Sequence, residues 1–261
     1  MTLHITTITP NHIISVSDRL ISTWSKSDSK YLELDNDLYK HVVLLNRYTR
    51  TTVSFAGLAG LTSLPKQTLD WLTKAISDSN NSNLTIDKQL AQVAIAADAY
   101  IARFSRRGIP AEALRLAIFA SGWTGTMEHG EVQYWCCIEN CLDRYWTWAP
   151  KARPKFTMHF KHFGGYKFKD GFTIAYLGND RLGLKQRAQL RVLGKYAKEE
   201  NPKRIFECSV DIIRAASTVS NGTIGQNCSG TRNSKGDPGL EVFDSRNNVK
   251  FDVMPNSIFS F

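Results

Sequence analysis

The sequence predicts an α+β protein in which two antiparallel β-sheets are stacked face to face between pairs of helices, a four-layer αββα sandwich. Three observations lead to this prediction. Strand-like segments come in runs, helix-like segments come in pairs, and the two do not alternate as they would in a doubly wound parallel sheet. We expect the 261 residues to form one domain, residues 1–261, with one sizeable core.

The first half of the chain is predicted to contain four strands and then two helices. Pro10-Asn11 marks the turn between the first two strands, and the polar stretch 23–37 is expected to be a loop. The predicted strands cover residues 3–9, 13–22, 40–45 and 51–56, and the predicted helices cover 65–77 and 86–106.

The second half is predicted to repeat this order and then to add two more strands. Asn201-Pro202 separates its two helices, and the Gly- and Ser-rich stretch 228–239 is expected to be a flexible loop. The predicted strands cover residues 114–121, 131–137, 155–163, 172–177, 223–228 and 240–253, and the predicted helices cover 182–199 and 202–219.

The composition is that of a folded soluble protein, with 42% hydrophobic and 22% charged residues. The chain has no apolar run long enough for a membrane span, and its first residues do not resemble a signal peptide. The five cysteines, an odd number, lack zinc-ligand spacing and are expected to be reduced thiols in the cytoplasm. The six histidines form no visible ligand set and are expected to be surface or core residues.

Basic and aromatic residues interleave between Lys151 and Lys169, in a chain of net charge +9. Such interleaving is found in surfaces that bind single-stranded nucleic acid. It is also what the wet and dry faces of a strand hairpin produce, and we favour this second interpretation because alternation alone explains the pattern.

Thr2 follows the initiator methionine directly. Once Met1 is removed, the free α-amine of Thr2 can accept the proton of its own hydroxyl. An α-amine has a reference pKa of about 7.7–8.0, so part of it is neutral near neutral pH. Thr2 is therefore a candidate nucleophile that carries its own base.

Asp18 and Lys40 are charged residues on the apolar faces of predicted strands. A buried carboxylate needs a partner, and an Asp–Lys pair between neighbouring strands satisfies both groups. A two-residue turn at Pro10-Asn11 sets Thr2 opposite Arg19. Adding one residue to the turn shifts the partner to Asp18 or Leu20, so each register brings Thr2 close to Asp18.

A glycine-rich segment starting at Gly57 directly follows the predicted strand 51–56. Bare backbone N–H groups in such a segment can stabilise a developing oxyanion. An ordinary strand-to-helix turn explains the same glycines equally well.

Taken in order, these residues resemble the N-terminal-nucleophile (Ntn) hydrolases of the proteasome β-subunit type, including their bacterial two-ring relatives. The resemblance is strongest over residues 2–60 and is only architectural beyond them. Its motifs are Met1-Thr2, ISVSDRLIS with Asp18, the strand opened by Lys40, and SFAGLAG with Gly57. It implies the αββα sandwich and a threonine-type hydrolase of amide bonds, a peptidase that needs no metal or organic cofactor.

The resemblance also implies a role for each residue. Thr2 would be the nucleophile, Lys40 the proton-shuttling lysine, Asp18 its orienting acid, and Gly57 the oxyanion donor. Ser22 would line the substrate cleft through its backbone. The family's supporting Ser and Asp residues have only approximate counterparts here. The candidates are Asn179, Asp180, Ser217 and Ser220.

The implied partners are a peptide or protein substrate and further copies of the chain in a homo-oligomer that could be a ring. Whether an unfoldase also takes part is not given by the sequence. Two other functions stay open. One is a small-molecule amidase on the same fold. The other is a non-catalytic scaffold, or a nucleic-acid-binding protein using residues 151–169. Cys137 and Cys228 are further candidate nucleophiles, but neither has a base nearby in sequence.

Overall fold

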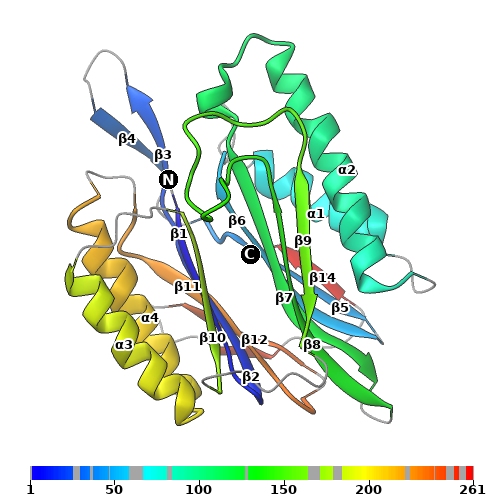
Figure 1. Cartoon of the computed structure of the whole chain (residues 1–261), viewed down its shortest axis with the longest axis vertical. Coiled ribbons are helices and arrows are strands. Elements are labelled where there is room, and N and C mark those ends of the chain that lie inside the picture. The colour runs from blue at the N-terminus through cyan, green and yellow to red at the C-terminus, as the bar shows by residue number, and fades with distance from the viewer. Residues whose placement is uncertain are drawn as a thin grey trace.

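The structure is a computed structural model in which pairs of helices enclose two β-sheets (Figure 1). It describes a set of segments that includes almost all of the predicted strands and helices. These are residues 2–25, 30–35, 38–46, 48–58, 67–80, 84–126, 129–163, 171–178, 184–220, 224–237, 239–244, 250–252 and 257–260.

The first sheet contains the N-terminal strand at its interior. Its neighbouring strands all pair in the antiparallel sense. Its order is β10 (Thr173–Gly178), β1 (Leu3–Ile8), β2 (His12–Asp18), β11 (Cys228–Ser234), β12 (Glu241–Asp244) and β13 (Lys250–Asp252).

The second sheet is also antiparallel and contains the strand that ends at Gly57. Its order is β14 (Ser257–Ser260), β5 (His41–Asn46), β6 (Thr49–Gly57), β7 (Leu116–Thr126), β8 (Gly130–Glu139) and β9 (Thr157–His162). A separate two-stranded sheet pairs β3 (Ile21–Ser25) with β4 (Lys30–Asp35).

The helices cover the outer faces of the two sheets, so the layers run α, β, β, α (Figure 1). Their apolar faces pack against the alternate, outward-facing residues of the strands. The helices α1 (Gln67–Ser79) and α2 (Ile86–Ser105) pack on the second sheet, and α3 (Leu184–Lys198) and α4 (Pro202–Ser217) pack on the first. A short 3-10 turn, η1 (Ala111–Ala113), precedes β7. This arrangement confirms the predicted αββα sandwich.

No helix among the described residues is long and apolar enough to cross a membrane.

Two stretches that were predicted to be loops contain strands. Most residues of the paired strands β3 and β4 lie within 23–37. The polar composition of this stretch had predicted a loop. The stretch 228–239 holds β11, a central strand between β2 and β12, so the loop prediction was wrong there. Its Thr231 and Asn233 side chains lie between the sheets. The Thr231 hydroxyl is 2.8 Å from that of Thr52, and the Asn233 amide donates to the carbonyl of Arg50. A polar layer between the sheets thus lets a Ser- and Thr-rich segment occupy the interior.

The register of the first hairpin matches the two-residue turn at Pro10-Asn11. Within the β1–β2 pair, His4 lies opposite Ser17, and the Thr9 N–H donates to the carbonyl of His12. The same register, continued past Leu3, sets Thr2 opposite Arg19. The length of the turn therefore determines which residue at the end of β2 lies opposite Thr2.

Candidate active site

Lys40 links the three polar residues that the sequence singled out. Its Nζ donates to the Thr2 hydroxyl at 2.8 Å, to Asp18 Oδ2 at 3.1 Å and to the Leu20 carbonyl at 2.6 Å. An ammonium has three N–H donors, so all three have acceptors here. The side chains of Lys40 and Asp18 have no exposed surface, and Thr2 is only 4% exposed. The structure therefore brings Thr2, Asp18 and Lys40 together in one buried site.

Asp18 is held by backbone donors as well as by Lys40. Its Oδ1 accepts from the N–H of Leu3 at 2.9 Å, and its Oδ2 accepts from the N–H groups of Leu20 and Gly225 at 3.3 and 3.2 Å. These N–H groups fix the position of the carboxylate beside the Lys40 ammonium. The carboxylate can thus compensate the charge of Lys40 without solvent.

Burial dominates the proton affinity of Lys40. Removal from water lowers the pKa of the Lys40 ammonium below its usual value, and the neighbouring Asp18 carboxylate opposes this shift. A lysine of lowered pKa gives up its proton more readily than an exposed one. In its neutral form it can accept the proton of the hydroxyl that lies 2.8 Å away.

Each side chain reaches the site because of where its strand begins or ends. Thr2 directly precedes β1, Asp18 is the last residue of β2, and Lys40 directly precedes β5 of the other sheet. Asp18 also lies opposite Cys228, the first residue of β11. The site therefore lies at one end of the sandwich, where the two sheets meet.

Gly57 ends β6 with φ at +102°, a conformation that favours glycine. The N–H of the next residue, Leu58, donates to the carbonyl of Arg115 on the β7 side. Because N–H groups of an antiparallel strand point alternately to either side, the Gly57 N–H points toward the β5 side. The β5–β6 ladder has already ended there, at the pair of His41 and Ser54. The Gly57 N–H is thus directed beyond the end of the β5–β6 ladder, whose hydrogen bonds would otherwise use it.

Comparison with known proteins rests on structure, because no family model and no curated protein sequence matches this chain. Anbu (ancestral beta-subunit) from Yersinia bercovieri is similar with a TM-score of 0.51 and 9% sequence identity, over 97% of this chain and 87% of that chain. The chain has the Ntn-hydrolase fold of Anbu. The helical assembly of the Anbu complex from Pseudomonas aeruginosa gives a TM-score of 0.53 and 10% identity, over 98% and 88%. The resemblance to proteasome β-subunit-type proteins is confirmed as a likeness of fold.

The predicted supporting residues of the second half have different outcomes within this Ntn-hydrolase fold. Asn179 and Asp180 lie outside the described residues. Ser217 is at the end of α4, and its hydroxyl donates to the Arg214 carbonyl at 2.7 Å. The Ser220 hydroxyl donates to the Ser217 carbonyl at 3.0 Å. It also accepts from the N–H of Ile224 at 3.1 Å, and Ile224 directly precedes Gly225, whose N–H donates to Asp18.

Ser22 lies in β3, where its backbone is opposite Glu33 of β4 next to an irregularity in the register. Its predicted role in binding substrate stays a prediction.

Two glycines of the site have no counterpart among the residues predicted from the sequence. Gly178, the last residue of β10, has φ at +116°, and a Cβ atom added there would overlap the carbonyl of Thr2. A Cβ atom at Gly225 would lie 2.7 Å from the Cβ of Leu20. Each glycine is thus required by a close approach between segments that are distant in the sequence. The amino-acid sequence contains no local signal that predicts such a contact.

The alternative nucleophiles are embedded in the core. All five cysteines are buried and unbridged. Burial raises the pKa of Cys228 to about 12 and raises the pKa of Cys137 well above its usual value. Neither thiol is activated as a nucleophile in this fold.

The basic–aromatic stretch follows the alternation of a strand where it is described. In β9, Met158 and Phe160 pack against the core under α2, whereas Lys161 is exposed. Residues 164–170 lie outside the described residues. The described part supports the interpretation as two faces of a strand.

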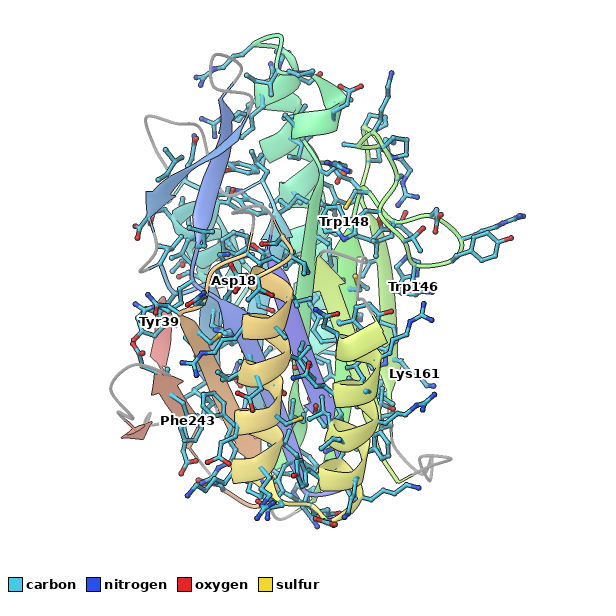
Figure 2. All side chains as sticks on the ribbon, turned by 90° about the vertical axis from the view of Figure 1, so that its left-hand side faces the viewer. Asp18, Tyr39, Trp146, Trp148, Lys161 and Phe243 are labelled. Carbon is cyan, nitrogen blue, oxygen red and sulfur yellow. The ribbon has the colours of Figure 1, made fainter. Side chains whose placement is uncertain are left out.

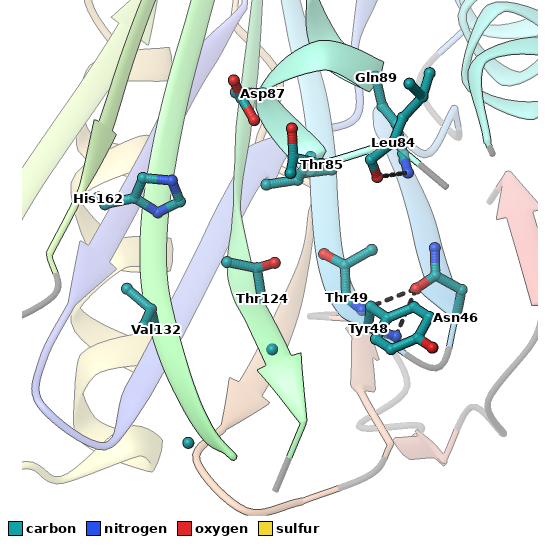
Figure 3. A pocket seen from close by; sticks show the side chains of 13 residues that line it. Asn46, Tyr48, Thr49, Leu84, Thr85, Asp87, Gln89, Thr124, Val132 and His162 are labelled. Carbon is teal, nitrogen blue, oxygen red and sulfur yellow. Dashed lines mark hydrogen bonds between the residues drawn. The ribbon is translucent and has the colours of Figure 1, made fainter. Parts of the chain in front are cut away.

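A pocket of about 580 Å³ lies at the other end of the second sheet (Figure 3). Its lining includes Thr49 at the start of β6, Asp87 at the start of α2 and His162 at the end of β9. Gly57 is at the far end of β6, roughly 26 Å along the strand. None of Thr2, Asp18, Lys40 and Gly57 lines this pocket, so it is separate from the candidate active site. Among the described residues, no three His, Cys, Asp or Glu side chains are grouped to hold a metal ion.

Proposed function

We propose that this protein is a threonine-type Ntn hydrolase that cleaves peptide bonds once Met1 has been removed. The observation that carries the proposal is the 2.8 Å contact between Lys40 Nζ and the Thr2 hydroxyl in a site shared with Asp18. The likeness to Anbu supports the fold that such chemistry requires. The residue roles below are part of the proposal.

The reaction begins at the Thr2 hydroxyl, which attacks the carbonyl carbon of the scissile amide. The α-amine of Thr2 takes the hydroxyl proton, and Lys40 and Asp18 hold the hydroxyl in place and set its proton affinity. The negative charge that develops on the carbonyl oxygen is stabilised by the Gly57 N–H. The C–N bond then breaks, and the amine of the leaving group departs with the proton that the α-amine returns.

The product of this step is an ester between the Thr2 oxygen and the acyl part of the substrate. Water, deprotonated by the same α-amine, attacks the ester carbonyl. The C–O bond breaks and regenerates the Thr2 hydroxyl, and the acid product leaves. The cycle uses only groups of the chain and water.

We further propose that the protein acts as a homo-oligomer in a reducing compartment such as the cytoplasm. The Anbu complex from Pseudomonas aeruginosa, a protein of the same fold, is described as a helical assembly. The five buried, unbridged cysteines suit a reducing compartment. Sedimentation analysis of the purified protein tests the assembly.

The decisive experiment measures intact mass before and after treatment with a peptide epoxyketone, which needs both the hydroxyl and the α-amine of an N-terminal threonine. We expect a protein that lacks Met1 and gains one probe mass, mapped to Thr2. Thr2→Ser should still react, and Thr2→Ala should not. Retained Met1, or a processed Thr2 that gains no mass, would rule the hydrolase out.

Substrate panels separate the peptidase from the small-molecule amidase. Fluorogenic peptides and simple amides are compared with the Thr2→Ala variant as the blank. If the unmodified protein cleaves the peptides and Thr2→Ala does not, the proposal is supported. If the unmodified protein cleaves only the simple amides, the amidase is supported.

A further inference from the structure

We infer that Asp244 of β12, with Arg19 and Tyr39, positions the Asp18–Lys40 pair for the reaction of Thr2. This inference rests on the proposed function. Asp244 belongs to the C-terminal part of the chain, where no local sequence signal connects it with the site.

Asp18 and Lys40 each have a neighbour in the chain, and these two neighbours also contact each other. Asp18 and Arg19 are consecutive at the end of β2, and Tyr39 and Lys40 are consecutive before β5. Asp18 and Lys40 contact each other beside Thr2. Their neighbours Arg19 and Tyr39 also contact each other, because the Arg19 guanidinium lies 3.9 Å from the centre of the Tyr39 ring. Figure 2 shows Tyr39 and Asp18 on the same side of the molecule.

Asp244 holds this second pair together through one oxygen. Its Oδ2 forms an ion pair with Arg19 Nη1 at 2.5 Å and accepts a hydrogen bond from the Tyr39 hydroxyl at 2.7 Å. The side chains of Arg19 and Asp244 are 1% and 4% exposed, so water hardly screens the attraction. A single carboxylate thus fixes the residue after Asp18 and the residue before Lys40.

The backbone of Arg19 extends the same connection to β11. The Arg19 N–H donates to the Asn227 carbonyl at 2.9 Å. Asn227 directly precedes Cys228, which lies opposite Asp18. It also lies two residues after Gly225, whose N–H donates to the Asp18 carboxylate. Movement of Arg19 would therefore displace the groups that hold Asp18.

Stability alone is a poor explanation for this arrangement. A buried ion pair costs so much desolvation that well-packed apolar residues often stabilise a fold as much or more. Catalysis is more demanding, because a displacement of about 1 Å at the reacting groups can cost about a hundredfold in rate. Rigid, directional contacts around Arg19 meet that demand where apolar contacts would not.

The test compares Asp244→Asn and Tyr39→Phe with a matched control. Asp244→Asn removes the charge at constant shape, and Tyr39→Phe removes only the hydroxyl. The control is Glu131→Gln, which breaks the buried ion pair of Glu131 with Arg50 at the opposite end of β6. Each variant is titrated with the peptide epoxyketone below its unfolding temperature, and the maximal labelling rate of Thr2 is separated from the half-saturating concentration.

We expect Asp244→Asn to lower the maximal rate roughly tenfold or more, with the half-saturating concentration unchanged. Tyr39→Phe should lower it by a smaller factor, and Asp244→Glu should recover part of the loss. Glu131→Gln should label like the unmodified protein, although it unfolds at a lower temperature. If Asp244→Asn does not fold, Tyr39→Phe and Asp244→Glu decide.

Asp18→Asn and Lys40→Met separate this inference from the proposed function. If these two lose labelling while the folded Asp244 and Tyr39 variants label like Glu131→Gln, the inference is wrong and the proposed function stands. If Asp18→Asn and Lys40→Met also label at the normal rate, both are wrong.

Discussion

Lys40 and Asp18 form an ion pair, Nζ to Oδ2 3.1 Å, in which neither side chain has any exposed surface. They come from different sheets, since Asp18 ends β2 and Lys40 precedes β5. The pair therefore joins the two halves of the sandwich at the point where Thr2 lies. The contribution of this ion pair to the stability of the fold and its contribution to the reaction of Thr2 can be measured separately.

Lys40→Met should abolish most labelling of Thr2, with a loss of about a hundredfold or more, because it removes the donor to the hydroxyl. It should also destabilise the fold by about 3–5 kcal/mol, since it leaves the Asp18 carboxylate buried without its counter-charge. Urea unfolding and epoxyketone labelling measure the two effects.

A double variant separates the two consequences of losing Lys40. Asp18→Asn combined with Lys40→Met removes both charges and should recover much of the stability, but none of the labelling. Recovery of both together would contradict the catalytic role of Lys40.

Gly178→Ala should impair folding and labelling together. An added Cβ atom would overlap the Thr2 carbonyl, and the positive φ adds backbone strain. The matched control is Gly236→Ala, at φ +72°, where a Cβ atom meets nothing within 4 Å. We expect the control to cost about 1 kcal/mol by urea unfolding and to label normally. Equal effects of the two variants would show that strain alone matters.

Two buried histidines between the sheets should make the protein sensitive to acid. Burial first, and then the charge of Lys40, lowers the pKa of His41 to about 3. Burial, His41 and Lys40 hold the pKa of His4 well below its usual value. The unfolded chain therefore binds more protons than the folded one below about pH 6.5, so stability falls as the pH falls.

The slope of this loss is measurable by urea unfolding between about pH 7 and about pH 5. Each histidine contributes up to about 1.4 kcal/mol per pH unit. His41→Gln removes one titrating group and should make the slope shallower by that amount. An unchanged slope would show that His41 does not titrate on unfolding in this range.

The cysteine thiols should be inert while the chain is folded. Burial raises the pKa of Cys136, Cys141 and Cys228 to about 12 and that of Cys208 to about 11. A thiol-reactive dye at about pH 8 should modify few thiols of the native protein and all five in urea. Cys228→Ala should keep its labelling at Thr2. A fast-reacting native thiol would reopen the question of the nucleophile.

The sequence predicted the first hairpin and the meeting of Asp18 with Lys40 because their signals are local, although it missed the strands β3 and β4. Charged Asp18 and Lys40 stand out on apolar strand faces, and Pro10-Asn11 limits the register to three choices. The structure has the first of these, with Thr2 opposite Arg19 by extension of the β1–β2 ladder. The paired helices likewise have clear apolar periodicity.

The rest of the site depends on contacts that local patterns do not encode. Asp244 and Gly225 approach Asp18 or its neighbour from more than two hundred residues away in the sequence. Segment 228–234 is polar enough to be mistaken for a loop, because its Thr231 and Asn233 side chains find partners on the opposite sheet. Long-range hydrogen bonding overrides local composition at these positions.

The position of β1 within its sheet has a consequence for biosynthesis. β1 lies between β2 and β10, and β2 also pairs with β11. The strands β1 and β2 are synthesised first, but their other partners, residues 173–178 and 228–234, are synthesised much later. Such distant pairings form late, because a long loop must close before they give any stabilisation. Thr2, the proposed nucleophile, is thus synthesised well before its site can form, and we expect it to be inert in a nascent chain until residues 228–234 have been added.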